Sequence, residues 1–334
     1  MSENILTFNR IIREHSKGKR GKNLKICKDF RLLSGSAGCC AGLTENFSYY
    51  ILGNGQAGRD RRFPEVNMKI DRKQASEAFE KYTARYNAQD EKVRLKIEHT
   101  WRVARLCETI ARSLGLPEEE TDLAWLTGLL HDVGRFEQLR RYGTFIDAES
   151  IDHAQYGAQL LFGSEAAETG GIRSFAADPS EDALIHTAVA WHSAYRIPDG
   201  LDERTARFCN ILRDADKIDI LKVNVDFPPE EIYNVSAQEL RSCQVSPEVM
   251  AAFYEEHAVL RSLKKTAADH LIGHASLVYE LVFPVSLRIV EEQGYLEQLL
   301  SFRSENPLTR EQFAEAGKHM EAWLAGKKEN GQKR

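Results

Sequence analysis

Long apolar runs are missing from this sequence of 334 residues. No stretch approaches the roughly 20 consecutive apolar residues that a membrane-spanning helix needs, and the N-terminus lacks an apolar core followed by a small-residue cleavage site. We therefore expect a cytoplasmic protein without a membrane partner. With 42% hydrophobic and 28% charged residues, the composition is typical of a globular protein with a buried core.

Cysteines are few and unpaired. The six Cys residues include no Cys-x-x-Cys pair, and they are too sparse for a disulfide scaffold. Cys107 and Cys209 fall on apolar helical stripes, which predicts core positions. Cys27, Cys39 and Cys40 lack the paired spacing of zinc ligands, so a metal site in a basic N-terminal arm is the less favoured alternative.

Basic residues are in excess only in the N-terminal part. Residues 1–67 carry 12 Lys and Arg against 6 Asp and Glu, whereas residues 68–334 carry 33 against 44. The acidic body is therefore a poor binder of nucleic acid. Residues 1–67 also hold 8 of the 22 Gly and show no sustained helical or strand period. We expect an N-terminal extension, disordered or translated from an upstream start codon, without a role in the chemistry.

From residue 68 onward the apolar spacing is helical, and the Val, Ile and Thr alternation of strands is missing. This pattern predicts an all-α protein with a core domain over residues 68–224 and additional C-terminal helices over residues 225–334 that pack on it. Helices are expected over residues 91–114, 118–131, 147–162, 178–192 with Asp178 as the cap, 203–223, 247–261, 266–293 with a kink at Pro284, and 308–326.

Histidines and aspartates recur on successive predicted helices. Nitrogen and carboxylate ligands on facing helices are how helical bundles hold metal ions. A set without thiolate suits one or two divalent ions such as Mn, Fe, Zn, Co or Mg. Asp132 follows an apolar run, Leu123–Leu130, where a buried carboxylate needs a partner such as a cation. The candidate ligands in chain order are His99, His131, Asp132, His153, His192 and Asp216.

Four of these residues carry a resemblance to a known family. His99, the doublet His131–Asp132 and Asp216 resemble the H…HD…D signature of the HD superfamily of metal-dependent phosphohydrolases, over residues 91–222. The resemblance implies an all-α HD-domain helical bundle in which these side chains hold one metal ion and Asp132 can bridge to a second. His153 and His192 resemble the additional ligands of dinuclear members.

Two ligand positions have a nearby rival. His186 and His192 are six residues apart and point about 120° apart on a helix, so one site is not expected to use both. We choose His192 because it lies at the end of its predicted helix. Asp214 and Asp216 point about 200° apart, so only one can face the metal. Asp214 then becomes a supporting or surface carboxylate, and Asp219 could reach the rim of the site.

Substrate contacts are expected close to the doublet. Arg135 and Gln138 share the face of His131 if the helix continues past it, and a guanidinium group suits a phosphate. Tyr142 and Lys217 are further candidates, although both could equally be solvated surface residues. His270 and His274 are spaced for chelation, but no Glu follows the first as a zinc-protease helix requires, so a helix face is expected.

The predicted activity is hydrolysis of a phosphoester, of a nucleotide or related small phosphorylated molecule, by metal-activated water. Asp132 holds the metal, while Arg135 and Lys217 take up charge on the phosphoryl oxygens. The alternatives are a di-iron oxygenase with the same ligands and a non-catalytic nucleotide-binding module. After His192 the Gly-Tyr-Pro of HD-GYP proteins is missing. Residues 225–334 could cover the mouth of the site or mediate homodimerisation.

Overall fold

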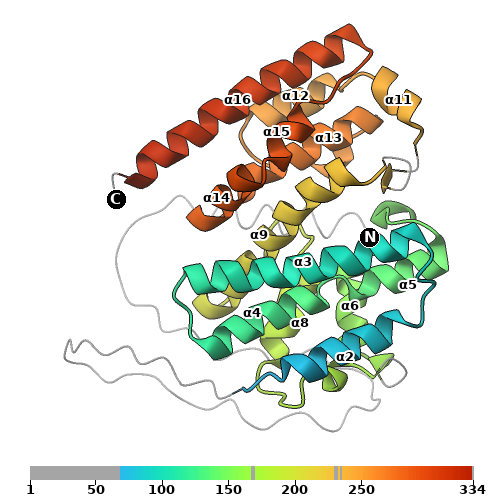
Figure 1. Cartoon of the computed structure of the whole chain (residues 1–334), viewed down its shortest axis with the longest axis vertical. Helices are drawn as coiled ribbons and strands as arrows, with labels where there is room; N and C mark the ends of the chain where they lie inside the picture. Colours follow the sequence, from blue (N-terminus) through green and yellow to red (C-terminus); the bar gives the residue numbers. More distant parts are fainter. Residues whose placement is uncertain (1–67, 167–169, 229–231, 234, 333–334) are drawn as a thin grey trace, which may run out of the picture. The chain divides into compact units, whose positions relative to one another are not determined.

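A computed structural model describes residues 68–166, 170–228, 232–233 and 235–332, so the expected extension over residues 1–67 lies outside the described residues. Every regular element of the described ranges is helical, which confirms the all-α prediction (Figure 1). The longer helices are α2 (Arg72–Thr83), α3 (Glu91–Ser113), α4 (Glu118–Leu130), α5 (Val133–Tyr142), α6 (His153–Phe162), α8 (Asp182–Trp191), α9 (Glu203–Asp226), α11 (Ala237–Ser242), α12 (Pro247–Tyr254), α13 (Ala267–Ala275), α14 (Pro284–Gln293), α15 (Tyr295–Leu300) and α16 (Pro307–Gln332).

Helices α3, α4 and α9 form the centre of the fold. Helix α3 packs along α4, and α9 packs against both. The Asp90 carboxylate accepts a hydrogen bond from the Lys92 N–H at the start of α3, and Gly115 follows its end with a φ of 70°. Cys107 and Cys209 are buried, as predicted. This core fixes the relative positions of the helices that carry the candidate ligands.

Helices α5 and α6 approach each other closely at two glycines. A β-carbon on Gly134 would lie 2.8 Å from the Gly157 nitrogen, and one on Gly157 would lie 3.2 Å from the Gly134 nitrogen. A side chain at Gly134 would therefore force the two helices apart. The close packing brings the start of α6, with His153, next to the start of α5, which directly follows Asp132.

The C-terminal helices pack on α9. Helices α13, α14 and α15 all contact it. Asp214 of α9 is completely buried, and its carboxylate accepts hydrogen bonds from the N–H groups of Val282 and Phe283 at the start of α14. Asp214 therefore supports this packing rather than lying at the surface. The proposed division at residue 224 stays a prediction, and α9 itself continues to Asp226.

Several helix boundaries differ from the expected ones. The segment 266–293 is not one kinked helix, because α13 ends at Ala275 and α14 begins afresh at Pro284. Proline lacks an N–H group and fits the first turn of a helix, so it starts α14 rather than bending a longer one. The helix expected over 247–261 ends at Tyr254. None of the helices in the described ranges is both long enough and apolar enough to cross a bilayer.

Two helices on the site side begin later than expected. Helix α6 starts at His153 because the Asp152 carboxylate accepts hydrogen bonds from the N–H groups of Ala154 and Gln155. The expected start near Asp147 is only a short 3-10 turn, Asp147–Glu149. Helix α8 starts at Asp182, since Asp178 caps a turn at Ser180 instead of the helix.

Candidate metal centre

The His131–Asp132 doublet lies at the break between α4 and α5. Helix α4 is buried over most of its surface, and Asp132, with φ −106° and ψ 16°, leaves the helical conformation before α5 begins. His131 is 0% and Asp132 is 2% exposed. The break turns the doublet into the interior and also re-aims α5, so Arg135 does not simply continue the face of His131.

A first group of ligand atoms comes from α3, the doublet and α9. His99 Nε2 lies 3.2 Å from His131 Nε2 and 3.2 Å from Asp216 Oδ1. Asp132 Oδ2 lies 3.5 Å from the Nε2 atoms of both histidines. Ligands bound at about 2.1 Å to one ion lie roughly 3.4 Å from one another in a tetrahedral arrangement. The four atoms therefore have the spacing of a metal site.

A second group of ligand atoms lies on the other side of the same carboxylate. His153 Nε2 is 3.1 Å from His192 Nε2, and Asp132 Oδ1 is 3.5 Å and 3.6 Å from these two nitrogens. Each oxygen of Asp132 thus faces its own pair of histidines. This arrangement suits a carboxylate that bridges two ions.

All four histidines are oriented by a hydrogen bond at Nδ1. Each Nδ1 lies beside an oxygen that can only accept, which assigns the proton to Nδ1 and leaves the Nε2 lone pair facing the centre. Two such lone pairs 3.1–3.2 Å apart repel each other unless a cation lies between them. The donor set therefore fits metal ions. The Nδ1 partners are Asp219 for His99, the Gly128 carbonyl for His131, Asp147 for His153 and the Val189 carbonyl for His192.

The protonation states agree with this orientation. Burial and the nearby charge of Arg135 lower the pKa of His153 to about 3, so its ring is neutral near pH 7. Burial alone would raise the pKa of Asp132, but the charge of Lys96 holds it well below its usual range. A neutral His153 imidazole beside the ionised Asp132 carboxylate is the form that binds a divalent cation. Burial and Lys96 oppose protonation of His99, but hydrogen bonds to Asp216 and Asp219 raise its pKa, so His99 gives up a proton when an ion binds.

Comparison with known proteins agrees with this geometry. Residues 97–221 match the family model of the HD domain. The chain contains an HD domain. All six candidate ligands lie inside the matched residues, and the resemblance inferred from the H…HD…D signature is confirmed.

One curated relative is similar to part of the chain. The chain is 32% identical over 87 residues to a 3'3'-cGAMP-specific phosphodiesterase 1 of Vibrio cholerae, over 23% of this chain and 20% of the relative. It thus spans about a fifth of the length of that protein. No solved structure matches the chain.

A cavity of about 480 Å³ opens onto the candidate metal centre. Asp132, His153, His192 and Asp216 line its floor, and Lys96 and Arg135 line its side. Residues 258–264, which follow α12, form part of its wall. The C-terminal region therefore contributes to the cavity.

Four side chains beside the candidate centre form hydrogen bonds that support its ligands: Asp147, Asp152, Arg135 and Gln138. Asp147 Oδ1 accepts hydrogen bonds from Arg135 and from Gln138, and Asp147 also holds His153 Nδ1. Although Asp147, Asp152 and His153 could together surround a further ion, the oxygens of Asp147 and Asp152 already accept from arginines and from α6 N–H groups. We assign them a supporting role.

Of the four predicted substrate contacts, two line the cavity and two do not. Arg135 lines the cavity. Gln138 is completely buried, and its amide donates to Asp147, to Ser150 and to the Ile151 carbonyl, so its expected role as a substrate contact is corrected: it orders this loop. Tyr142 is 48% exposed and does not line the cavity, which corresponds to the surface alternative. Lys217 lines the cavity.

Two residues that support the candidate ligands were not predicted, and a third has a role other than the expected one. Lys96 donates to Asp132 Oδ2 at 2.8 Å, and Arg102 donates to Asp219 at 2.7 Å. Asp219 lies behind His99 and is 2% exposed, rather than at the rim. Helical spacing could have found these residues, since Lys96 and Arg102 flank His99 by three positions and Asp219 follows Asp216 by three.

Replacing Asp219 by asparagine tests the orientation of His99. The amide removes the negative charge that holds the His99 Nδ1 proton and leaves Arg102 with only its longer ion pair to Glu98, at 3.7 Å. We expect a 10- to 100-fold loss of metal affinity, in the range found for such supporting partners, measured by calorimetric titration of the metal-stripped protein. Asp226→Asn, on the same helix but paired with Lys222, is the matched control. Equal affinities for both variants would contradict the assignment.

His270 and His274 do not form a metal site with other described residues. His274 Nδ1 lies 2.9 Å from Asn224 Oδ1 and 2.8 Å from the Tyr233 hydroxyl, and the Tyr233 ring stacks on it. This pair packs one helix face against Tyr233, as expected from its spacing.

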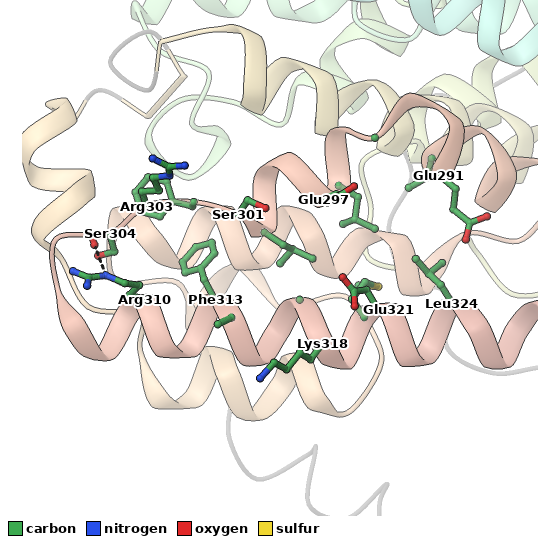
Figure 2. A pocket seen from close by; sticks show the side chains of 18 of the residues that line it. Glu291, Glu297, Ser301, Arg303, Ser304, Arg310, Phe313, Lys318, Glu321 and Leu324 are labelled. Atoms are coloured by element: carbon green, nitrogen blue, oxygen red, sulfur yellow. Dashed lines mark hydrogen bonds between the residues drawn. The ribbon is translucent and has the colours of Figure 1, made fainter.

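A larger cavity of about 980 Å³ lies among α14, α15 and α16 (Figure 2). Its lining is apolar at Phe313 and Leu324 and charged at Glu297, Arg303 and Arg310. None of the candidate metal ligands contributes to it. The chemistry therefore belongs to the smaller cavity over the HD ligands.

Proposed function

We propose that this chain is a metal-dependent phosphohydrolase that cleaves a phosphoester of a nucleotide or related small molecule. The observation that carries the proposal is the Asp132 carboxylate, whose two oxygens each face a pair of histidines beneath a cationic cavity. The Vibrio cholerae relative, a 3'3'-cGAMP-specific phosphodiesterase, supports a phosphodiester of a nucleotide as the substrate class.

The residues divide into two ligand sets. His99, His131, Asp132 and Asp216 would hold one divalent ion, and His153, His192 and the second oxygen of Asp132 would hold another. Bound divalent ions lower the pKa of water toward neutrality and offset charge on phosphoryl oxygens. Asp219 and Asp147 keep the histidine rings in position, and the protein excludes bulk water from the ligands by burying them.

Arg135 is placed to bind a phosphoryl oxygen. Its Nη1 is held by Gln138, the Phe145 carbonyl and Asp147. Its Nε is a buried N–H group without a hydrogen-bond partner and lies 3.7 Å from Asp132 Oδ1. A buried donor without a partner costs free energy, which a phosphate oxygen would recover. Arg135 therefore binds and orients the scissile phosphate.

A hydrolysis panel tests this function. Metal-stripped protein is supplied with Mn, Co, Mg, Fe or Zn and incubated with nucleotides and phosphoesters, in air and without oxygen. We expect release of phosphate or nucleotide product that requires the metal and does not require oxygen. Product formed only in the presence of oxygen would instead identify the di-iron oxygenase. Tight nucleotide binding without any product would identify a binding module.

A further inference from the structure

Six cationic side chains line the cavity over the metal centre, and four of them are already engaged by the protein. Lys96 is paired with Asp132, and Arg135 and Arg261 are both paired with Asp147. Arg213 donates to backbone carbonyls between Trp191 and Tyr195. Three of these four therefore hold the site together, and Arg135 does so as well while its Nε group stays available for the scissile phosphate.

Lys217 and Lys264 are the other two, and they differ from the first four. In the described ranges no carboxylate lies within ion-pair distance of either ammonium group. Lys217 Nζ donates only to the Glu280 carbonyl, at 3.3 Å. Asp269 is an acid close to Lys264, but its oxygens accept from Ser246 and from the N–H groups of Lys265 and Thr266.

Lys264 is held inside the cavity wall rather than in solvent. The end of its side chain packs on Gly273 of α13, where a β-carbon would collide with it. Burial, aided by Arg261, lowers the pKa of this ammonium group to about 8. Burying a charge without an ionic partner is costly. A second cation in the same cavity, Lys217, has Asp214, Asp216 and Glu280 in its surroundings but none of them within ion-pair distance. The two ammonium groups can therefore receive negative charge from a ligand.

We propose that Lys264, together with Lys217, binds a second phosphate of the substrate, one that is not cleaved. This inference rests on the proposed function and narrows its substrate to nucleotides with a phosphate in addition to the scissile one, such as a cyclic dinucleotide or a linear dinucleotide with a terminal phosphate. The volume, about 480 Å³, lies in the range of small-molecule sites. Ile220, Val259 and Leu277 add apolar surface against which a base can pack.

The test compares two dinucleotides that differ by one phosphate. ApA contains only the phosphodiester, whereas pApA carries an additional 5'-phosphate, and kcat/KM is measured for both with the metal-loaded protein. For the wild type we expect pApA to be preferred by about tenfold or more, since charge-assisted hydrogen bonds have this effect. Lys264→Met should reduce the preference to near one. Lys265→Met is the matched control, because Lys265 is 62% exposed and paired with Glu248, and it should keep the preference.

Other outcomes separate this inference from the proposed function. A wild type that does not distinguish the two dinucleotides, or a Lys264→Met variant that keeps the preference, would overturn the second-phosphate site. If neither dinucleotide is cleaved, the proposed function fails on this class, and calorimetric binding of the same pair still decides the inference. If Lys264→Met also lowers kcat/KM for cyclic di-AMP, the second-phosphate site serves cyclic substrates as well as pApA. Thermal melting checks folding, and removal of an uncompensated charge should not lower the melting temperature.

Discussion

Replacing Asp132 by alanine is expected to abolish metal binding and turnover together. This carboxylate faces both histidine pairs, so its removal takes one ligand from each site. It also leaves Lys96 buried without its partner at 2.8 Å. Loss of one stabilising group in an active site commonly costs 10²–10³ in rate, and here two ions are affected, so we expect a loss above about 10³-fold. Metal content by mass spectrometry and product release on the hydrolysis panel measure the two effects.

The controls for this variant concern charge and folding. Asp178→Ala removes an exposed carboxylate that caps only a turn at Ser180, and it should keep both metal and turnover. Asp132→Asn keeps the side-chain volume, so circular dichroism and thermal melting of this variant separate loss of metal from loss of fold. Full turnover of either Asp132 variant would refute the metal centre.

Replacing His192 by alanine is expected to reduce the metal content from two ions to one. His192 lies closest to His153 and one oxygen of Asp132, although His131 of the first group is also close enough to share an ion with it. The first group keeps its four ligands. A phosphoryl group that is normally held by two ions would then be held by one, with about half of the charge compensation. We therefore expect turnover to fall by about 10²-fold or more. Metal stoichiometry and kcat are measured on protein loaded with excess metal.

His186→Ala is the matched control on the same helix. Its ring contacts Phe162 at a centroid distance of 5.4 Å and belongs to neither ligand group. This variant should keep two ions. If His192→Ala also keeps two ions, or loses both, the two groups are not separate sites.

The candidate metal ligands could be chosen from the sequence because the pattern that marks them is local. A His-Asp doublet at the end of an apolar helix is costly without a cation, and helical angles restrict the choice between His186 and His192 or between Asp214 and Asp216. In the structure His192 lies beside His153, and Asp214 instead accepts from the start of α14. The ligand roles themselves stay predictions.

The residues that line the walls of the cavity could not be predicted from the sequence in the same way. Arg135 and Gln138 depend on a break in the helix at Asp132, which re-aims α5 and buries Gln138. Lys264 reaches the cavity only because the C-terminal helices pack on α9, and no spacing within its own segment reports that packing. The cytoplasmic location and the homodimer stay predictions.

Asp147 has a consequence for how the C-terminal region and the metal centre depend on each other. One carboxylate holds His153, Arg135 and Arg261, and Arg261 belongs to the segment that walls the cavity. An ion bound by His153 would therefore depend on the same carboxylate that anchors the wall segment through Arg261. We expect removal of the Asp147 carboxylate to weaken the second proposed ion site and the cavity wall together, which would couple the two.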